Sequence, residues 1–563
     1  MVERPLIELL KAAESWQGRA DRRAQRPLGE LLKDAGIITD EMINYALTIQ
    51  RVSRERLGDV LLRLRFTTDS EVARVLARQA GSAYTALDSI VPTADALSQV
   101  PFTVAQKTGL LPLDVIEGNL IVATHDPFNV EIENRIGRFT SYPVKLVVAP
   151  ASRLHRLIQR AYYIAEHPID EEIQRLAESI LAGRDFSAER LFDLLISSAI
   201  DLHASDLHVS PTPAATLVSY RVDGVLQLRY ALPPLTHGRV VSTCKVRAGL
   251  DIADATRAQD GRMSFTFLDG NYDLRVSTMP ATQGENLVVR ILSGGGELIS
   301  LEDIGFNTHQ LDLLRTMTAH PHGTILVTGP TGSGKTTSLY GMLRRINAME
   351  KNVLTIEDPV EYQMPLMRQV EVNEKAGINF AGAIRSFLRQ DPDVILVGEI
   401  RDEETATQAM RAAQTGHLVF SSLHTNDALG AIMRLRDLGI VDYVLSSSLI
   451  GIVAQRLLRR LCNQCKRPME GTQGKLWEFL PMNTLYEHVG CDYCHGTGYT
   501  GRQAVAEILV IDEEMSRLIE SGSSPYELSR VANERGHHTM QVAGVEMVKA
   551  GITDITEFKR VLA

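Results

Sequence analysis

Residues 325 to 337 read Ile325-Leu-Val-Thr-Gly329-Pro330-Thr331-Gly332-Ser333-Gly334-Lys335-Thr336-Thr337, and this stretch decides the fold. Its apolar, β-branched start predicts a buried strand that runs directly into a glycine-rich loop and a helix. In such a loop the backbone N–H groups and the helix N-terminus bind phosphates, Lys335 neutralises the β- and γ-phosphate oxygens, and Thr336 offers its hydroxyl to Mg²⁺. The sequence therefore predicts a P-loop in which residues 329 to 337 bind ATP.

Further apolar runs follow the P-loop. Residues 394 to 397 (Val-Ile-Leu-Val) and 418 to 421 (Leu-Val-Phe-Ser) each read as a buried strand, and helical stretches separate them. This rhythm predicts an α/β domain with a largely parallel sheet whose strand ends carry the chemistry. Glu399 follows the first of these strands, where a carboxylate can orient the attacking water or hold the Mg²⁺ shell.

Other candidate catalytic groups have a structural alternative. Glu357 and Glu361 lie in the run Thr355-Ile-Glu-Asp-Pro-Val-Glu361, which can polarise water or merely cap a turn. His417 and His424 flank the second strand, where a histidine can sense the γ-phosphate or serve as a satisfied structural residue. The residues alone leave both alternatives open.

Arginines recur in the region before the P-loop. A bidentate guanidinium suits a phosphate with developing charge, whereas most arginines are solvated surface residues, and the sequence does not decide between these roles. The candidates are Arg221, Arg257, Arg262, Arg275 and Arg290.

Four of the five cysteines form two Cys-x-x-Cys pairs, Cys462/Cys465 and Cys491/Cys494. Two such pairs provide four soft thiolate ligands in a tetrahedron and no open position for water, so they predict a structural zinc site. So few cysteines in so long a chain exclude a disulfide scaffold and favour a reducing compartment. The fifth, Cys244, is expected to be a buried core thiol.

Length and composition set the outer limits. A chain of 563 residues corresponds to about three to five domains, and 44% hydrophobic with 23% charged residues is typical of folded soluble proteins. The net charge of −10 leaves no overall basic field for nucleic acid or anionic lipid. We find neither a signal peptide nor an apolar run of roughly 18 residues. We therefore expect a cytoplasmic protein that meets the membrane only through partners.

An internal repeat occupies residues 26 to 79. Pro27 to Gln50 aligns with Arg56 to Gln79 at a period of 29 residues, and each half reads as a short helix, a turn and a longer helix that Thr39 or Thr68 caps. The repeat and the changes in helix and strand pattern that follow it predict that the chain divides into seven segments. They are a helical-repeat module (1–82), a small α+β subdomain (83–165), a linker (166–186), a second α+β domain (187–293), the ATPase domain (298–460), a zinc-binding subdomain (461–500) and a helical C-terminal subdomain (501–563), with Gly294–Gly296 as a hinge.

Taken together, these features resemble the secretion ATPase superfamily of type II secretion and type IV pilus assembly, most closely general secretion pathway protein E. The resemblance spans roughly Leu202 to the C-terminus. It rests on five ordered motifs: the P-loop at 329–336, the Asp box at 355–361, the Walker B segment at 395–406, the His box at 416–427 and the cysteine tetrad.

The resemblance implies a RecA-like P-loop ATPase domain and a PAS-like α+β N2 domain that clamp ATP in a homohexamer. It implies that Glu399 activates water or organises Mg²⁺, that Glu357 and Glu361 are second-line acids, and that His417 and His424 are the two His-box histidines. Segments of N2 would bring arginines to the phosphates, with Arg221 and Arg275 in catalysis and Arg262 and Arg290 in nucleotide binding. Where the family has Lys-Arg a few residues before Gln259-Asp-Gly-Arg262, this chain reads Ala255-Thr256-Arg257, so Thr256 stands at the family's arginine position and Arg257 would replace it from the neighbouring position.

The implied work is mechanical. Acting with an inner-membrane platform protein and the cytoplasmic domain of a membrane-anchoring component, the motor would assemble the pseudopilus of type II secretion. Type IV pilus extension ATPases share every motif quoted and remain an alternative. A DNA-translocating hexamer would show basic tracts, which the −10 balance argues against, and a non-hydrolysing regulator would not need Lys335, Thr336 and Glu399 together.

The N-terminal repeat resembles the cyclic di-GMP-binding module of some of these ATPases, whose halves follow Arg-Leu-Gly-x-x-Leu-x-x-x-Gly. The second half keeps Arg56-Leu57-Gly58 but has Arg65 where the motif has Gly, and the first half keeps Gly36 but has Pro27 in the Arg position. Binding of cyclic di-GMP and a purely structural role in partner docking are both open.

Overall fold

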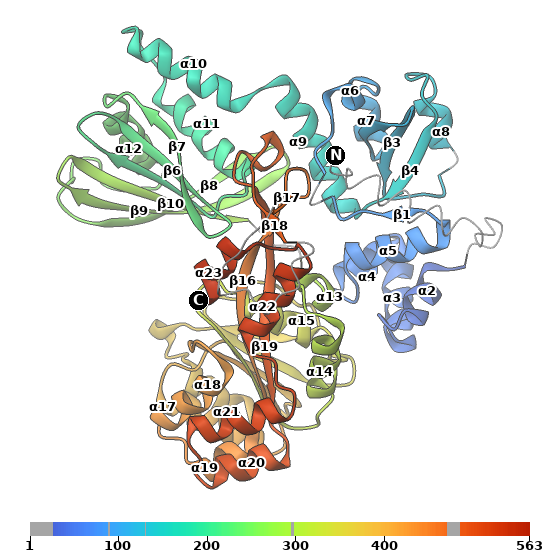
Figure 1. The fold of residues 1–563 in the computed structure, drawn as a ribbon, viewed down its shortest axis with the longest axis vertical. Helices are drawn as coiled ribbons and strands as arrows, with labels where there is room; N and C mark the ends of the chain where they lie inside the picture. The colour runs from blue at the N-terminus through green and yellow to red at the C-terminus, as the bar shows by residue number, and fades with distance from the viewer. Residues whose placement is uncertain (1–25, 88–89, 130, 294–297, 470–484) are drawn as a thin grey trace. The chain divides into compact units, whose positions relative to one another are not determined.

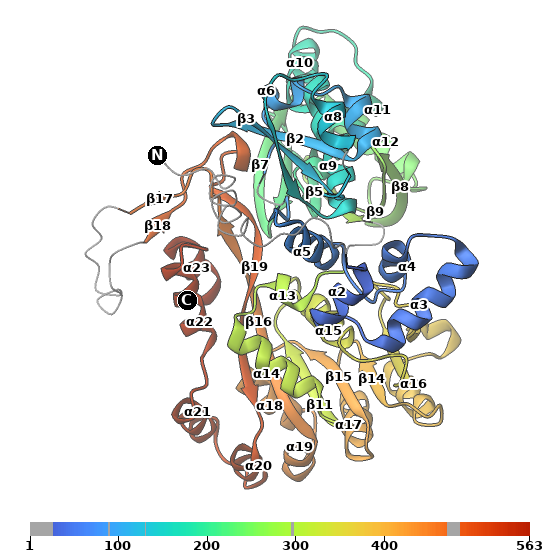
Figure 2. The same ribbon diagram turned by 90° about the vertical axis from the view of Figure 1, so that its right-hand side faces the viewer.

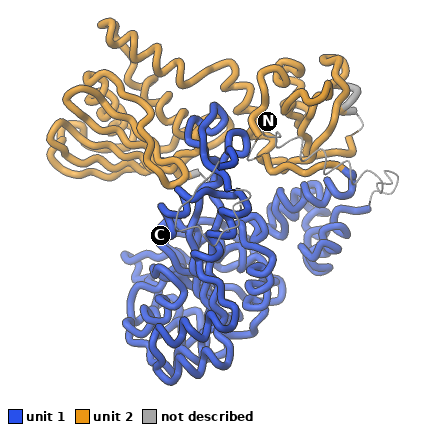
Figure 3. The backbone as a smooth tube through the Cα atoms, in the orientation of Figure 1, with its two compact units in different colours: residues 1–81, 297–563 blue, residues 82–296 orange. Residues whose placement is uncertain are grey.

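The computed structural model describes residues 26–87, 90–129, 131–293, 298–469 and 485–563. They divide into two compact units, residues 1–81 with 297–563 and residues 82–296 (Figure 3). The predicted hinge at 294–296 lies outside the described residues. Within the described ranges, no helix is both long and apolar enough to cross a membrane.

The first unit is built on a seven-stranded sheet with the strand order β13-β12-β14-β15-β11-β16-β19 (Figure 1). Every neighbouring pair in it is parallel except β16 and β19, which confirms the predicted, largely parallel α/β fold. The strands are β11 (Gly323–Thr328), β12 (Val353–Glu357), β13 (Arg368–Glu371), β14 (Val394–Val397), β15 (Leu418–Leu423), β16 (Leu449–Leu461) and β19 (Tyr499–Val510), and a short pair, β17 (Arg467–Pro468) and β18 (Tyr486–Glu487), lies outside the sheet.

Helices connect these strands and bury both faces of the sheet. One apolar cluster gathers Ile395, Val419 and the C-terminal helices, and another gathers Ile325, Leu396 and the P-loop helix α15, so the central strands are buried on both sides. The helices are α13 (Leu301–Ile304), α14 (Thr308–Thr318), α15 (Lys335–Leu343), η1 (Glu374–Ala376), α16 (Phe380–Phe387), α17 (Glu403–Gln414), α18 (Ala428–Asp437), α19 (Asp442–Ser448), η2 (Asp492–Cys494), α20 (Glu513–Glu520), α21 (Pro525–Glu534), α22 (Met540–Lys549) and α23 (Ile555–Leu562).

The N-terminal repeat belongs to this same unit and has the predicted form. Each half is a short helix followed by a longer one, and the hydroxyls of Thr39 and Thr68 accept hydrogen bonds from the first turns of the longer helices. Leu32, Leu61 and Val75 contribute to their shared core. The four helices are α2 (Leu28–Asp34), α3 (Asp40–Ser53), α4 (Leu57–Arg63) and α5 (Asp69–Ala80) (Figure 2).

The second unit carries two sheets. A four-stranded mixed sheet has the order β1-β4-β3-β2, and a six-stranded antiparallel sheet has the order β7-β6-β5-β10-β9-β8. The strands are β1 (Ala83–Tyr84), β2 (Leu110–Ile116), β3 (Asn119–Thr124), β4 (Val144–Val148), β5 (Asp206–Pro211), β6 (Thr216–Val222), β7 (Val225–Leu232), β8 (Gln259–Phe267), β9 (Gly270–Ala281) and β10 (Gly284–Ser293). The helices are α6 (Ala94–Ser98), α7 (Phe102–Thr108), α8 (Glu131–Ile136), α9 (Ala151–Glu166), α10 (Ile169–Leu181), α11 (Ala188–Asp201) and α12 (Thr236–Arg247).

The segment predicted as a linker contains α10. Ile169, Ile173 and Ile180 of this helix are buried in the apolar core that α11 and the six-stranded sheet share. In the same domain a tight turn joins β6 to β7 through Asp223 and Gly224, whose φ angles are positive at 50° and 81°. Helix α10 therefore packs as part of the six-stranded domain.

Candidate active site

The P-loop follows β11 and wraps tightly against β16. A Cβ atom at Gly329 would lie 2.5 Å from the backbone oxygen of Gln455, and one at Gly334 would lie 2.7 Å from the Gln455 side-chain nitrogen. Gly334 also has a φ angle of 87°, which favours glycine. These two positions require glycine because the loop curls over the neighbouring strand, as a phosphate-binding loop must.

Lys335 is the first residue of α15. Its Nζ donates hydrogen bonds to the carbonyl oxygens of Gly329, at 2.7 Å, and Pro330, at 3.2 Å. Burial lowers the pKa of Lys335, the carboxylate of Glu399 acts against that shift, and the guanidinium of Arg456 adds to it. The ammonium is therefore held within the loop, close to one carboxylate and one further cation.

Glu399 lies just beyond β14, at the edge of the sheet where the P-loop begins. Its side chain is 16% exposed, one carboxylate oxygen pairs with Arg401, and the other lies 3.4 Å from Nε2 of His424. His424 follows the end of β15, the strand between β14 and β11. Parallel strands bring their carboxyl ends together, so Glu399, His424 and Lys335 lie at one edge of the sheet.

Glu357 is held as a buried anchor. It accepts hydrogen bonds from the Tyr340 hydroxyl and the Thr355 hydroxyl, both at 2.6 Å, and from the Gln369 amide at 3.3 Å. Because these donors occupy its oxygens and only 4% of the residue is exposed, Glu357 ties α15 to the Asp box rather than facing solvent.

Glu361 is the acid of the Asp box that points to the nucleotide loop. Its side chain is partly exposed, but desolvation by the surrounding protein and the neighbouring Glu357 raise its pKa, and a hydrogen bond with the Thr336 hydroxyl acts against that rise. Hydroxyl and carboxylate oxygens are the ligands that Mg²⁺ prefers. The donor set Thr336 and Glu361, with Glu399 across the loop, therefore fits a magnesium ion.

His417 does not join this cluster. It precedes β15, whereas His424 follows it, and a strand of six residues spans about 20 Å. Its Nδ1 lies 2.8 Å from the carbonyl oxygen of Ala412 at the end of α17. Within this chain His417 fixes a helix end at the opposite edge of the sheet.

Two residues of β16 belong to the site although no sequence motif marks them. The fully buried Gln455 donates to the carbonyl oxygen of Ser333 at 2.8 Å and accepts from the Ser338 hydroxyl at 2.6 Å. Arg456 donates to the backbone and side-chain oxygens of Asn426, both at 3.1 Å, and burial lowers its pKa. Only knowledge that β16 neighbours β11 could have found them.

Four of the five candidate arginines form one row across the six-stranded sheet of the second unit. Arg221 pairs in register with Asp206, Asp206 with Arg290, Arg290 with Arg275, and Arg275 with Arg262. Directly paired residues share a face of a sheet, and Asp206 bridges Arg290 at 3.0 Å and Arg221 at 3.7 Å. One carboxylate among four guanidinium groups leaves this row with a net positive charge, which suits phosphates.

Arg257 stands outside this row. It lies in the loop before β8, is 81% exposed and pairs with Asp254 at 2.5 Å. The loop itself is held by the buried Lys245, whose Nζ donates to the carbonyl oxygen of Asp254 at 2.9 Å.

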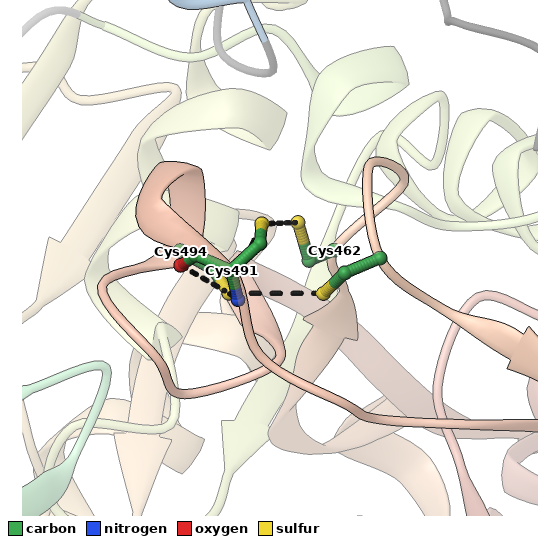
Figure 4. A group of neighbouring side chains, drawn as sticks. Cys462, Cys491 and Cys494 are labelled. Atoms are coloured by element: carbon green, nitrogen blue, oxygen red, sulfur yellow. Dashed lines mark hydrogen bonds between the residues drawn. The ribbon is translucent and has the colours of Figure 1, made fainter.

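The cysteine tetrad closes into one cluster. Figure 4 shows the sulfur atoms of Cys462, Cys491 and Cys494 facing one another, and the Sγ–Sγ distances are 3.9 Å for Cys462–Cys491, 3.8 Å for Cys465–Cys494 and 3.7 Å for Cys491–Cys494. A tetrahedral zinc ion with Zn–S bonds of about 2.3 Å sets its sulfurs about 3.8 Å apart. The spacing fits zinc and is too long for a disulfide.

Backbone amides support the thiolates. The N–H groups of Gly490, Cys491 and Gly498 donate to cysteine sulfurs at 3.1–3.3 Å. This geometry is therefore compatible with the predicted four-cysteine zinc site. The fifth cysteine, Cys244, is a buried core thiol, and burial raises its pKa to about 12.

Comparison with known proteins agrees with this geometry. The family model described as type II/IV secretion system protein matches residues 182–560, and the MshEN domain model matches residues 80–168. The chain is 35% identical to the type IV pilus assembly ATPase PilB of Myxococcus xanthus over 94% of this chain and 98% of that protein. It is 43% identical to the type II secretion system protein E of Dickeya dadantii over 68% of this chain and 78% of that protein.

Among solved structures, the Yersinia pseudotuberculosis ATPase DotB matches with a TM-score of 0.50 at 20% identity, covering 67% of this chain and 94% of that one. This structural likeness supports the RecA-like fold, and the assignment of ATP hydrolysis rests on the sequence matches. The chain hydrolyses ATP, and it belongs to the type II/IV secretion system protein family of secretion and pilus assembly ATPases.

Proposed function

We propose that the protein is a hexameric ATPase motor that drives pseudopilus assembly for type II protein secretion. The observation that carries the proposal is the cluster of Lys335, Glu399 and His424 at one edge of a parallel sheet in a chain of this family. A cytoplasmic motor held at the inner membrane by a platform protein and a membrane-anchoring component fits the family resemblance.

The residues divide the work of phosphoryl transfer. Lys335 exchanges its contacts with the loop carbonyls for the phosphates, and Glu399 orients the attacking water while Arg401 and His424 hold its two oxygens. Mg²⁺, when bound at Thr336 with Glu361 and Glu399 nearby, supplies neutralising charge on the phosphates. The arginine row of the second unit stabilises the developing negative charge.

The zinc ion has a structural task in this proposal. Cys462, Cys465, Cys491 and Cys494 would hold it with no position left for water, so it would fasten the ends of β16 and β19.

Type IV pilus extension is the second candidate. The match to PilB of Myxococcus xanthus covers 94% of this chain, whereas the match to protein E of Dickeya dadantii covers 68% at the higher identity of 43%. The greater coverage of the PilB match therefore supports pilus extension, whereas the higher sequence identity to protein E supports type II secretion.

Binding of cyclic di-GMP at the N-terminal repeat stays a prediction. The MshEN domain match supports it, although that match covers residues 80–168, which follow the repeat.

Phosphate release tests the motor and the site together. We expect Lys335→Ala and Glu399→Gln each to lower kcat at least about 100-fold, and His417→Gln, at the far edge of the sheet, to stay within about threefold of wild type. Wild-type turnover by Lys335→Ala would refute the site. In the source bacterium, a deletion that blocks secretion and spares surface pili would support the first pathway, and the reverse phenotype would support the second.

A further inference from the structure

The N-terminal repeat and the P-loop helix meet at a buried ion pair. Glu71 of α5 accepts two hydrogen bonds from Arg344, at 2.5 and 2.6 Å, and the side chains are 9% and 11% exposed. Arg344 is the C-cap residue of α15, the helix that begins at Lys335. Breaking a buried pair by removing one partner leaves an uncompensated charge and is strongly unfavourable.

Other contacts extend this junction. Arg74, one turn along α5, pairs with Asp303 of α13, whose other oxygen accepts from the Ser300 hydroxyl at 2.7 Å. Leu366, beyond the Asp box, packs against the core of the repeat. The repeat thus contacts the end of α15, helix α13 and the loop that follows the Asp box.

The two halves of the repeat differ at the residues that make these contacts. At the period of 29 residues, Glu71 and Arg74 correspond to Met42 and Tyr45 of the first half. Both halves form the same helix pair, so the helical fold does not require the two charged residues. They occur only in the second half, where they form the two ion pairs with the motor.

Arg65 follows the same rule. It corresponds to Gly36, and both residues have positive φ angles, 60° for Arg65 and 68° for Gly36. A non-glycine residue is strained in this conformation. The pKa of Tyr362, in the loop after the Asp box, is raised by burial, and Arg65 is close enough to act against that rise. With arginine in place of glycine, the second half of the repeat has a positive charge near the loop that follows the Asp box of the motor.

We propose that the second half of the repeat, α4 and α5, docks on the motor through Glu71–Arg344 and Arg74–Asp303 and restrains ATP turnover. The chain leaves the first unit after Gly81 and returns to it at Glu297, so the unit that carries the arginine row is tied to the motor at both of its ends while the repeat stays docked. When the repeat is released, the second unit stays connected to the motor only through its C-terminal end. The second unit, which carries the arginine row, is then freer to move in each cycle of ATP hydrolysis. This regulation rests on the proposed role of the arginines.

A charge-swap cycle in the full-length protein tests the docking. Glu71→Arg and Arg344→Glu each set like charges against each other, whereas the double variant restores the pair in reverse. Glu71 also completes the N-cap of α5 by accepting from the Thr68 backbone at 2.8 Å. Thr68→Ala therefore serves as the matched control, because it weakens the cap and leaves the ion pair.

Two readouts separate docking from its consequence. We expect each single variant to speed hydrogen exchange in residues 57–80 and 335–344 and to raise kcat at least about twofold, and the double variant to return both values toward wild type. The docking would be overturned if the single variants exchanged hydrogen at the wild-type rate. It would also be overturned if the double variant restored neither hydrogen exchange nor kcat, or if Thr68→Ala had an effect as large as the charge variants. Restored exchange with unchanged kcat would overturn the restraint. Absence of turnover in the wild type would instead refute the proposed motor, while the exchange cycle would still report on docking.

Discussion

The side-chain amide of Gln455 donates a hydrogen bond to the carbonyl oxygen of Ser333, at 2.8 Å, and so holds the P-loop from the neighbouring strand. The same side chain accepts from the hydroxyl of Ser338 on the P-loop helix. Both ends of one fully buried carboxamide are therefore used to fix the loop and the helix relative to each other.

Gln455→Leu should weaken ATP binding. The variant leaves two buried polar groups unsatisfied, at about 1–3 kcal/mol, and if this cost falls on the nucleotide-bound state it corresponds to a roughly 5- to 150-fold loss of affinity. Gln455→Glu retains the acceptor for Ser338 but sets a buried carboxylate against the Ser333 carbonyl oxygen, so it should weaken binding as well. ATP affinity measured by titration decides the matter, and wild-type affinity of Gln455→Leu would show that the loop holds its shape without this contact.

Arg275→Ala should lower kcat at least about tenfold, since a guanidinium that neutralises transition-state charge acts on the chemical step. Arg257→Ala, in the loop outside the row, should have a smaller effect because Asp254 already pairs its guanidinium. Steady-state kinetics with both variants compare the two. A larger loss for Arg257→Ala would move the phosphate contact from the sheet to the loop.

Zinc should be bound at one ion per chain and should support the C-terminal helices. Lys466 donates to Gly551, and His488 and Tyr499 contact Asp554 at 2.6 and 2.9 Å, so the cluster is braced against α22 and α23. We expect Cys465→Ser to lose the metal and to lower Tm by several degrees, roughly 2–4 °C for each kcal/mol lost in a domain of this size. Cys244→Ala should retain full zinc in elemental analysis, and zinc retained by Cys465→Ser would contradict the assignment.

The fully buried Glu557 makes the first unit sensitive to acid. Burial acts to raise its pKa, but hydrogen bonds from Arg560 and Arg459 lower it to about 2. An unfolded glutamate titrates near pH 4.3, so the stabilisation is complete above that pH and is lost as the pH falls toward 2. Thermal unfolding followed from pH 6 to pH 3 should show this loss.

Glu557→Gln should flatten that pH dependence and lower stability at neutral pH by about 3 kcal/mol or more, because Arg459 is left without its carboxylate. Glu534→Gln, in an exposed pair with Arg530, is the matched control and should change little. An unaltered acid slope in Glu557→Gln would assign the sensitivity to another carboxylate.

Local patterns predicted the parts that depend on neighbouring residues. The P-loop, the strands at 394–397 and 418–421 and the cysteine pairs each combine residue type and spacing within a short stretch, and the structure confirms them. Gln455 could not be predicted, because its role depends on β16 lying beside β11, more than 100 residues earlier in the chain.

Three other outcomes depend on three-dimensional geometry that sequence spacing does not contain. The His box groups His417 with His424, yet a strand separates them. The segment at 166–186 reads as a linker because its outer face is charged, while the isoleucines that α10 buries are only one side of the helix. The arginines could be identified individually, but their alignment depends on the register of four strand pairs.

Strand β16 has one further consequence. It supplies Gln455 and Arg456 to the nucleotide loop and, seven residues on, ends beside Cys462, a distance of about 23 Å along a continuous strand. Over this stretch β16 pairs with β19 alone, because its pairing with β11 ends at Ala454. The nucleotide loop and the cysteine cluster are therefore joined by one pair of antiparallel strands, and we expect the accessibility of the four thiols to change when a nucleotide binds.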